Sequence, residues 1–172
     1  MCGIIGHVGD RDTLDSLVGG LEKLEYRGYD SAGVAVRNGE GVDVYKCSGE
    51  VSELKRTVAG VEASDGVGIG HTRWSTHGPP TRANAHPHTD ATDRLAIVHN
   101  GVIENYDELK ADLEAAGYEF TSDTDTEVVP HLMTEFLHRG HDSLSAVRAT
   151  VDELDGRYAI TAIVDDDDDI YA

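Results

Sequence analysis

The chain alternates between short apolar stretches and longer stretches in which apolar residues recur every three or four positions. Short apolar stretches are typical of buried strands, and the longer periodicity is typical of amphipathic helices. The pattern predicts strands at residues 2–8, 31–36, 42–47, 66–72, 95–99, 157–164 and 170–171. It predicts helices at residues 12–28, 51–58, 105–117, 124–138 and 143–154.

The connections carry further signals. Residues 38–41, Asn-Gly-Glu-Gly, are typical of a hairpin turn. Glycine at positions 66, 68 and 70 predicts that another backbone comes close to one face of that strand. Residues 74–90 form a long connection rich in proline, histidine and threonine, and connections of this length are usually functional or mobile. Asn105 and a capping box at 124–127 predict two helix starts.

Composition narrows the function classes. The 172 residues are enough for one domain, and 33 acidic against 14 basic residues give a net charge of −19. This charge argues against nucleic acid and anionic membranes as partners, and it resembles proteins from a high-salt cytoplasm. No apolar run approaches the roughly 18 residues of a membrane helix. With Cys2 and Cys47 as the only cysteines, no disulfide framework is expected, and a cytoplasmic location is predicted.

Cys2 is the strongest single candidate for chemistry. It follows the initiator Met directly, so removal of Met1 would leave a thiol and a free α-amine on one residue. The reference pKa values of the two groups, about 8.5 and 7.7 to 8.0, allow the amine to accept the thiol proton near neutral pH. Cys2 is therefore a candidate nucleophile with its own base, and an inert small residue is the alternative.

Three polar clusters fall at predicted strand ends. Arg73, within His-Thr-Arg-Trp-Ser-Thr-His-Gly at 71–78, is suited to a bidentate grip on a carboxylate, or it forms a surface ion pair. Asn100 and Gly101 could supply the donors of an oxyanion hole, or they form an ordinary turn. Asp125 could bind an ammonium group, or it caps its helix.

Two groups of residues raise the question of metal binding. Histidines 71, 77, 86, 88 and 99 are close in sequence, but their spacing matches no familiar zinc ligand set, so packing and hydrogen-bonding roles are favoured. The five aspartates at 165–169 lack the alternating spacing and closing glutamate of a calcium loop, so a solvated turn is favoured. No metal and no cofactor is predicted.

Six segments together resemble the class II glutamine amidotransferases, and within them the isomerizing sugar-phosphate aminotransferases. They occur in the order of that family along the whole chain, at residues 2–6, 26–33, 71–78, 84–88, 99–105 and 124–128. Amidophosphoribosyltransferases, the main alternative, typically have Gln-His-Arg-Gly-Gln-Glu-Ser where this chain has Tyr-Arg-Gly-Tyr-Asp-Ser at 26–31. A non-catalytic fragment or metal-binding module is the alternative from a different class.

The resemblance implies roles for individual residues. Cys2 would be the nucleophile that attacks L-glutamine, and Asn100 and Gly101 the oxyanion donors. Arg73 would hold the substrate carboxylate and Asp125 its ammonium group. The remaining expected substrate-binding and supporting residues are Trp74, Thr76 and His77 in a closing loop, with His86 and Arg27 around the site.

The resemblance also implies an α+β fold, the four-layer αββα sandwich of the N-terminal-nucleophile hydrolases, in which two antiparallel sheets lie between helical layers. The family's domain is several tens of residues longer than this chain, so residues 1–172 are expected to be an incomplete amidotransferase domain. The sugar isomerase domains that accept the ammonia are absent from it. The full enzyme is expected to be a homodimer.

Overall fold

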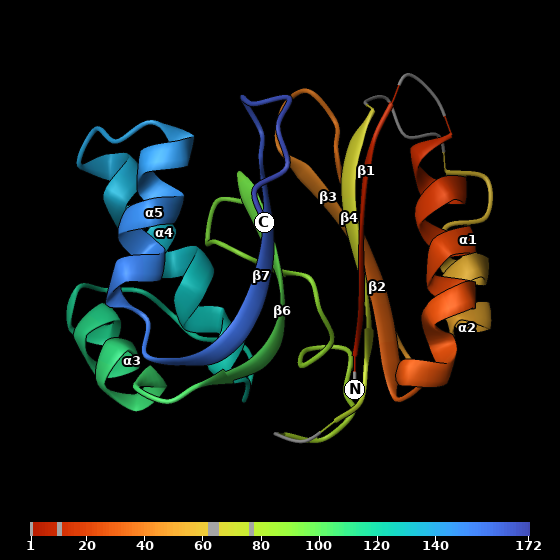
Figure 1. Ribbon diagram of the computed structural model, residues 1–172, viewed down its shortest axis with the longest axis horizontal. Helices are drawn as coiled ribbons and strands as arrows, with labels where there is room; N and C mark the ends of the chain where they lie inside the picture. The colour runs from red at the N-terminus through yellow and green to blue at the C-terminus, as the bar shows by residue number, and fades with distance from the viewer. Residues whose placement is uncertain (1, 10–11, 62–65, 76–77) are drawn as a thin grey trace.

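The computed structural model describes residues 2–9, 12–61, 66–75 and 78–172. Two antiparallel sheets lie face to face, and Figure 1 shows helices on the outer side of each. The expected four-layer αββα arrangement is therefore confirmed. None of the helices among the described residues combines the length and apolar character needed to cross a lipid bilayer.

The first sheet has four strands in the spatial order β1-β4-β2-β3. Their bounds are β1 Gly3–Val8, β2 Ser31–Arg37, β3 Val42–Ser48 and β4 Val67–Arg73. The predicted hairpin is confirmed, since β2 and β3 pair antiparallel on either side of residues 38–41. The register places Gly3 opposite Thr72 and Ser31 opposite Arg73, which brings the start of β1 and the end of β4 together.

The second sheet has three strands in the order β5-β6-β7, with bounds β5 His88–Thr89, β6 Leu95–Ile103 and β7 Gly156–Val164. The prediction that a strand ends at His99 is wrong, because β6 continues through Asn100 and Gly101 to Ile103. Nine consecutive pairs with β7 hold this stretch extended. Asn100 and Gly101 therefore form no turn.

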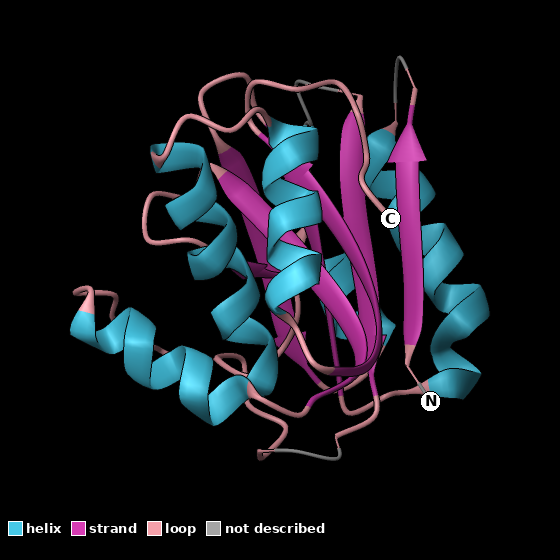
Figure 2. Cartoon of the chain, turned by 60° about the vertical axis from the view of Figure 1, so that its left-hand side comes forward, coloured by secondary structure: helices cyan, strands magenta, loops and turns pink. Residues whose placement is uncertain are grey.

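Helices cover the outer faces of both sheets, as Figure 2 shows from a second direction. They are α1 Thr13–Leu24 and α2 Val51–Thr57 on the first sheet, and α3 Tyr106–Ala115, α4 Val128–His138 and α5 Ser143–Glu153 on the second. Short 3-10 turns, η1 Glu25–Arg27 and η2 Asp125–Glu127, follow α1 and precede α4. A Cβ on Gly66 would lie 1.6 Å from the backbone oxygen of Gly9, as the predicted close backbone approach requires, whereas the nearest atom at Gly68 is a side-chain carbon of Leu17 in α1, at 2.8 Å.

Apolar residues fill three layers between these elements. The layer between the two sheets includes Val67 and Ile69 from β4 together with Ala96 and Val98 from β6. A second cluster lies between the first sheet and its helices, and a third lies between the second sheet and its helices. This packing sets the distance between β4 and β6, the strands that carry two of the three polar clusters named above.

Two predicted helix caps are wrong in detail. The side chain of Asn105 bonds the backbone of Glu153 and Asp155 instead of its own helix. Glu127, the expected end of the capping box, accepts hydrogen bonds from the backbone N–H groups of Thr121 and Ser122. The chain therefore forms the 3-10 turn η2 where the capping box predicts the first turn of an α-helix.

Candidate active site

Cys2 lies directly before β1, against the end of β4. Its Sγ accepts a hydrogen bond from the backbone N–H of Trp74 at 3.2 Å. The next residue, Gly3, donates its N–H to Thr72 Oγ1, also at 3.2 Å. The thiol is partly exposed and forms no disulfide. The start of β1 and the end of β4 thus hold the thiol in place while leaving it accessible.

The segment at 28–30 explains why Trp74 can reach the thiol. A Cβ on Gly28 would lie 2.6 Å from the backbone carbon of Arg73, so only glycine leaves room for this peptide group. Asp30 donates its backbone N–H to Arg73 O at 3.0 Å and accepts the Ser75 N–H at 2.8 Å. Asp30 lies within the family-like segment at 26–33, but the sequence alone indicates no role for it.

Arg73 and Asp125 place opposite charges beside the thiol. Arg73 is only 5% exposed, so the interpretation as a surface ion pair is wrong. Burial holds the pKa of Arg73 below its usual value, and the charges of Cys2, Asp125 and Asp30 offset this effect only in part. Asp125 is also buried and accepts the backbone N–H of Ile103 at 2.8 Å, so its side chain caps no helix.

Asn100 reaches the same place from the second sheet. Its Nδ2 donates to the backbone oxygen of Cys2 at 3.3 Å, and its Oδ1 lies 2.9 Å from His71 Nε2. Gly101 has φ +122°, and a Cβ there would lie 2.1 Å from Arg157 O, so a side chain is excluded on two counts. The two residues expected to act as oxyanion donors are therefore held rigidly beside the thiol.

These side chains surround one small cavity of about 40 Å³. Its lining residues are Cys2, His71, Arg73, Trp74, His86, His99, Asn100, Gly101, Thr124, Asp125 and Thr126. The structure thus brings together seven of the predicted site residues from segments that are far apart in sequence. A thiol, a buried cation, a buried carboxylate and an amide around one polar cavity can bind a zwitterion and attack a carbonyl group.

The three remaining predicted residues lie away from the cavity or outside the described part, whereas Trp74 lines the cavity at its exposed side. Arg27, on η1, donates to the Tyr26 hydroxyl and does not line the cavity. Trp74 is 44% exposed, with its ring edge-on to Tyr29 at the cavity rim. Thr76 and His77 lie outside the described residues.

Four buried histidine rings pack together at the cavity, and His71, His86 and His99 line it. His71 and His86 are stacked with their centroids 4.2 Å apart, and His88 and His99 flank His86. Burial lowers the pKa of His71 to about 4 and that of His88 to about 3, so both are neutral at pH 7. Among the described residues, no group of three or more histidine, cysteine, aspartate or glutamate side chains is arranged to hold a metal ion.

These neutral histidines predict a loss of stability in mild acid. The unfolded chain binds protons at histidine near pH 6.5, whereas the folded chain binds them only near pH 4 or below, so stability falls as the pH drops from 7 to 5. Each such histidine should lower the free energy of unfolding by about 2 kcal/mol at pH 5. Urea unfolding at the two pH values measures the loss. In the His88→Gln variant, the loss of unfolding free energy between pH 7 and pH 5 should be smaller by the contribution of one histidine. An unchanged pH dependence in that variant would show that His88 is not a buried neutral histidine.

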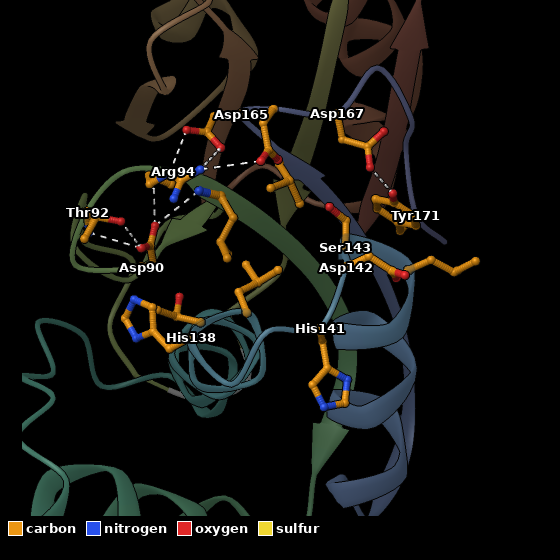
Figure 3. A pocket seen from close by; sticks show the side chains of 16 residues that line it. Asp90, Thr92, Arg94, His138, His141, Asp142, Ser143, Asp165, Asp167 and Tyr171 are labelled. Carbon is orange, nitrogen blue, oxygen red and sulfur yellow. Dashed lines mark hydrogen bonds and ion pairs between the residues drawn. The ribbon is translucent and has the colours of Figure 1, made fainter.

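The aspartate run makes contacts within the protein. Arg94 binds Asp165 through Nε and Nη2 at 2.8 and 3.0 Å, while Arg37 binds Asp168 and Tyr171 binds Asp167. Part of the run borders a cavity of about 510 Å³, shown in Figure 3, on the side of β7 next to α5. Most of these carboxylates therefore serve as partners of cationic and hydroxyl groups.

Comparison with known proteins gives a family. A family model described as a glutamine amidotransferase domain matches residues 71–172, more than half of the chain. The chain belongs to this family.

Among curated relatives, a glutamine–fructose-6-phosphate aminotransferase (isomerizing) of Thermus thermophilus is 52% identical over 172 residues. The enzyme of the same name from Sulfolobus acidocaldarius is 47% identical over 167 residues. These alignments cover 100% and 95% of this chain but 28% of each relative, so the chain spans little more than a quarter of their length.

Solved structures confirm the fold of the amidotransferase domain. Glutamine phosphoribosylpyrophosphate amidotransferase from B. subtilis, complexed with ADP and GMP, superimposes with a TM-score of 0.78 at 27% identity. The match covers 94% of this chain and 35% of that one. A class II domain protein from Silicibacter pomeroyi shares the fold with a TM-score of 0.60 at 16% identity, over 94% of this chain and 72% of that one. The fold is thus the N-terminal-nucleophile hydrolase sandwich expected from the sequence.

Proposed function

We propose that this domain hydrolyses L-glutamine to L-glutamate and ammonia, with Cys2 as the nucleophile. The observation that carries the proposal is the position of the Cys2 thiol, in one cavity with Arg73, Asp125 and the Asn100 amide. Loss of Met1 frees the α-amine of Cys2, which then accepts the thiol proton. The sulfur attacks the side-chain amide carbon of glutamine and forms a tetrahedral intermediate.

The intermediate places a negative charge on the former carbonyl oxygen. Asn100 Nδ2 carries two hydrogens, one of which is directed to the Cys2 oxygen, and the second is available to that oxyanion together with the Gly101 N–H. The C–N bond then breaks, and ammonia leaves with the proton held by the α-amine. Water opens the resulting γ-glutamyl thioester to release glutamate and regenerate the thiol.

Recognition of the substrate as an amino acid falls to two buried charges. Arg73 binds the α-carboxylate of glutamine, and Asp125 binds its α-ammonium group. Both are desolvated before the substrate arrives, which strengthens their attraction for opposite charges. Trp74, Thr76 and His77 belong to the loop that closes over glutamine, with His86 and Arg27 supporting the site.

For the whole protein, we infer that the ammonia passes to fructose 6-phosphate, giving glucosamine 6-phosphate. The relatives that carry this name are about 50% identical to the chain, whereas the phosphoribosylpyrophosphate amidotransferase structures are under 30% identical. We further propose that sugar isomerase domains follow residue 172 and that the full enzyme is a homodimer. Its location would be the cytoplasm of an organism with a high internal salt concentration. No cofactor takes part in the glutaminase step.

A glutaminase assay on the full-length protein, in high salt, tests the proposal. The wild type should release glutamate and ammonia from glutamine, and Arg73→Lys should raise KM at least about tenfold with a smaller effect on kcat, because lysine loses the planar fork. Arg37→Lys is the matched control, since Arg37 is a buried arginine that binds Asp167 and Asp168 instead. No hydrolysis by the wild type would favour a non-catalytic module, and an unchanged KM would make Arg73 structural.

A further inference from the structure

The side-chain amide of Asn100 is held at both of its ends. Nδ2 donates to the Cys2 oxygen at 3.3 Å, and Oδ1 lies 2.9 Å from His71 Nε2. His71 belongs to β4 in the first sheet, and Asn100 belongs to β6 in the second. This bond therefore crosses the space between the sheets and ties the amide to the sheet that carries Cys2.

The two ends of an amide have almost the same shape but opposite hydrogen-bonding character. With Nδ2 toward Cys2, the amide offers donors on the side of the cavity. If it turned over, it would place Oδ1, an acceptor, on that side and would repel an oxyanion. The partner of the far end therefore decides whether the site contains a donor or an acceptor.

His71 fulfils this function only when its Nε2 carries a hydrogen. A ring nitrogen with a lone pair would repel Oδ1 at 2.9 Å and would favour the overturned amide. The surroundings of His71 disfavour the doubly protonated ring: the side chain is 1% exposed, and burial with the charges of His99 and Arg73 outweighs the hydrogen bonds to Asn100 and to the His99 backbone, which favour it. Burial lowers the pKa of His71 to about 4, so the ring is neutral at pH 7.

The neighbouring ring fixes the position of His71. His86 lies nearly parallel to it, with 16° between the planes. The orientation of His86 is itself set by two contacts, because its Nδ1 accepts the His99 backbone N–H at 3.2 Å and its Nε2 lies 3.3 Å from Thr126 Oγ1. His71 therefore rests against a ring that is anchored to β6 and η2.

We propose that His71 is a positioning residue for glutamine hydrolysis: it donates its Nε2–H to Asn100 Oδ1 and thereby keeps Asn100 Nδ2 directed toward Cys2. This inference rests on the proposed function of the site. His71 acts through Asn100 alone, so its removal should weaken the transition state without changing glutamine binding. Its influence should also disappear once the Asn100 amide is absent.

A matched pair of variants separates the donor from the ring volume. The amide nitrogen of glutamine can occupy the place of Nε2, whereas that of asparagine falls near Nδ1. His71→Asn should lower kcat about 10- to 100-fold with KM within about threefold. His71→Gln should recover most of the lost kcat. A loss in KM instead of kcat, or an equal loss in both variants, would overturn the proposal.

A double-mutant cycle tests whether His71 works through Asn100. In the Asn100→Ala background, adding His71→Asn should change kcat by less than about twofold. The same loss of about 10- to 100-fold in both backgrounds would show a packing role and overturn the proposal. The wild-type rate in this assay tests the proposed function separately.

The tautomer of His71 can also be read directly, without any variant or activity. Nitrogen-15 NMR of the wild-type protein at pH 7 should show a neutral His71 ring with its hydrogen on Nε2. A ring with the hydrogen on Nδ1, or a charged ring, would overturn the proposal even if the variants failed to fold.

Discussion

Replacing Cys2 with alanine should lower the rate of glutamine hydrolysis by at least about 10³-fold. Without the sulfur no thioester can form, and Cys47, the other cysteine of residues 1–172, is buried in the core and cannot take its place at the site. The assay is the release of glutamate by the full-length protein. An intact-mass measurement on the same sample should show that the active protein lacks Met1, since an amide at the Cys2 nitrogen cannot accept a proton.

Cys47 provides the matched control. It lies in β3 with its side chain in the core beneath α2, and burial raises the pKa of its thiol. Cys47→Ala should therefore leave kcat within about twofold, and an electrophilic glutamine analogue should label Cys2 and leave Cys47 unlabelled. Labelling of both cysteines, or substantial activity in the Cys2→Ala variant, would rule out the proposed nucleophile. Activity in protein that retains Met1 would rule out the α-amine as its base.

The sequence predicted those elements whose signals are local. The β2–β3 hairpin has both a turn sequence and flanking apolar strands, and helix α1 has an apolar face, so each could be located from neighbouring residues. Only the resemblance to a known family predicted that one site contains Cys2, Arg73, Asn100 and Asp125. The hydrophobic periodicity of the chain gives no such indication. Their common cavity is a property of the two packed sheets.

The predictions from sequence were wrong where a contact with a residue far away in the chain overrides the local sequence pattern. Asn100-Gly101 has the composition of a turn, but the ladder with β7 keeps both residues extended. Glu127 completes a capping box in sequence, yet Thr121 and Ser122 occupy its carboxylate. The contact of His71 with Asn100 spans 29 residues and two sheets, so no local pattern could indicate it.

Replacing Asn100 with alanine should lower kcat by about 10² to 10³-fold while leaving KM for glutamine within about threefold. The reason is that the amide meets charge only when the substrate oxygen becomes an oxyanion, which happens on formation and on breakdown of the thioester. Arg73 and Asp125 still bind the amino acid end of glutamine in this variant. Steady-state kinetics of glutamate release in the full-length protein gives both constants.

Asn38→Ala controls for the loss of an asparagine side chain, because Asn38 lies at the β2–β3 turn and bonds Asp43 and Glu40. This variant should keep the wild-type kcat. Strand β6 is fixed by its pairing with β7, so Asn100→Ala should also keep its fold, which urea unfolding would verify. If the Asn100→Ala variant hydrolysed glutamine at the wild-type rate, or lost affinity instead of rate, the amide would not be the oxyanion donor. The Gly101 N–H would then have to stabilise that charge without it.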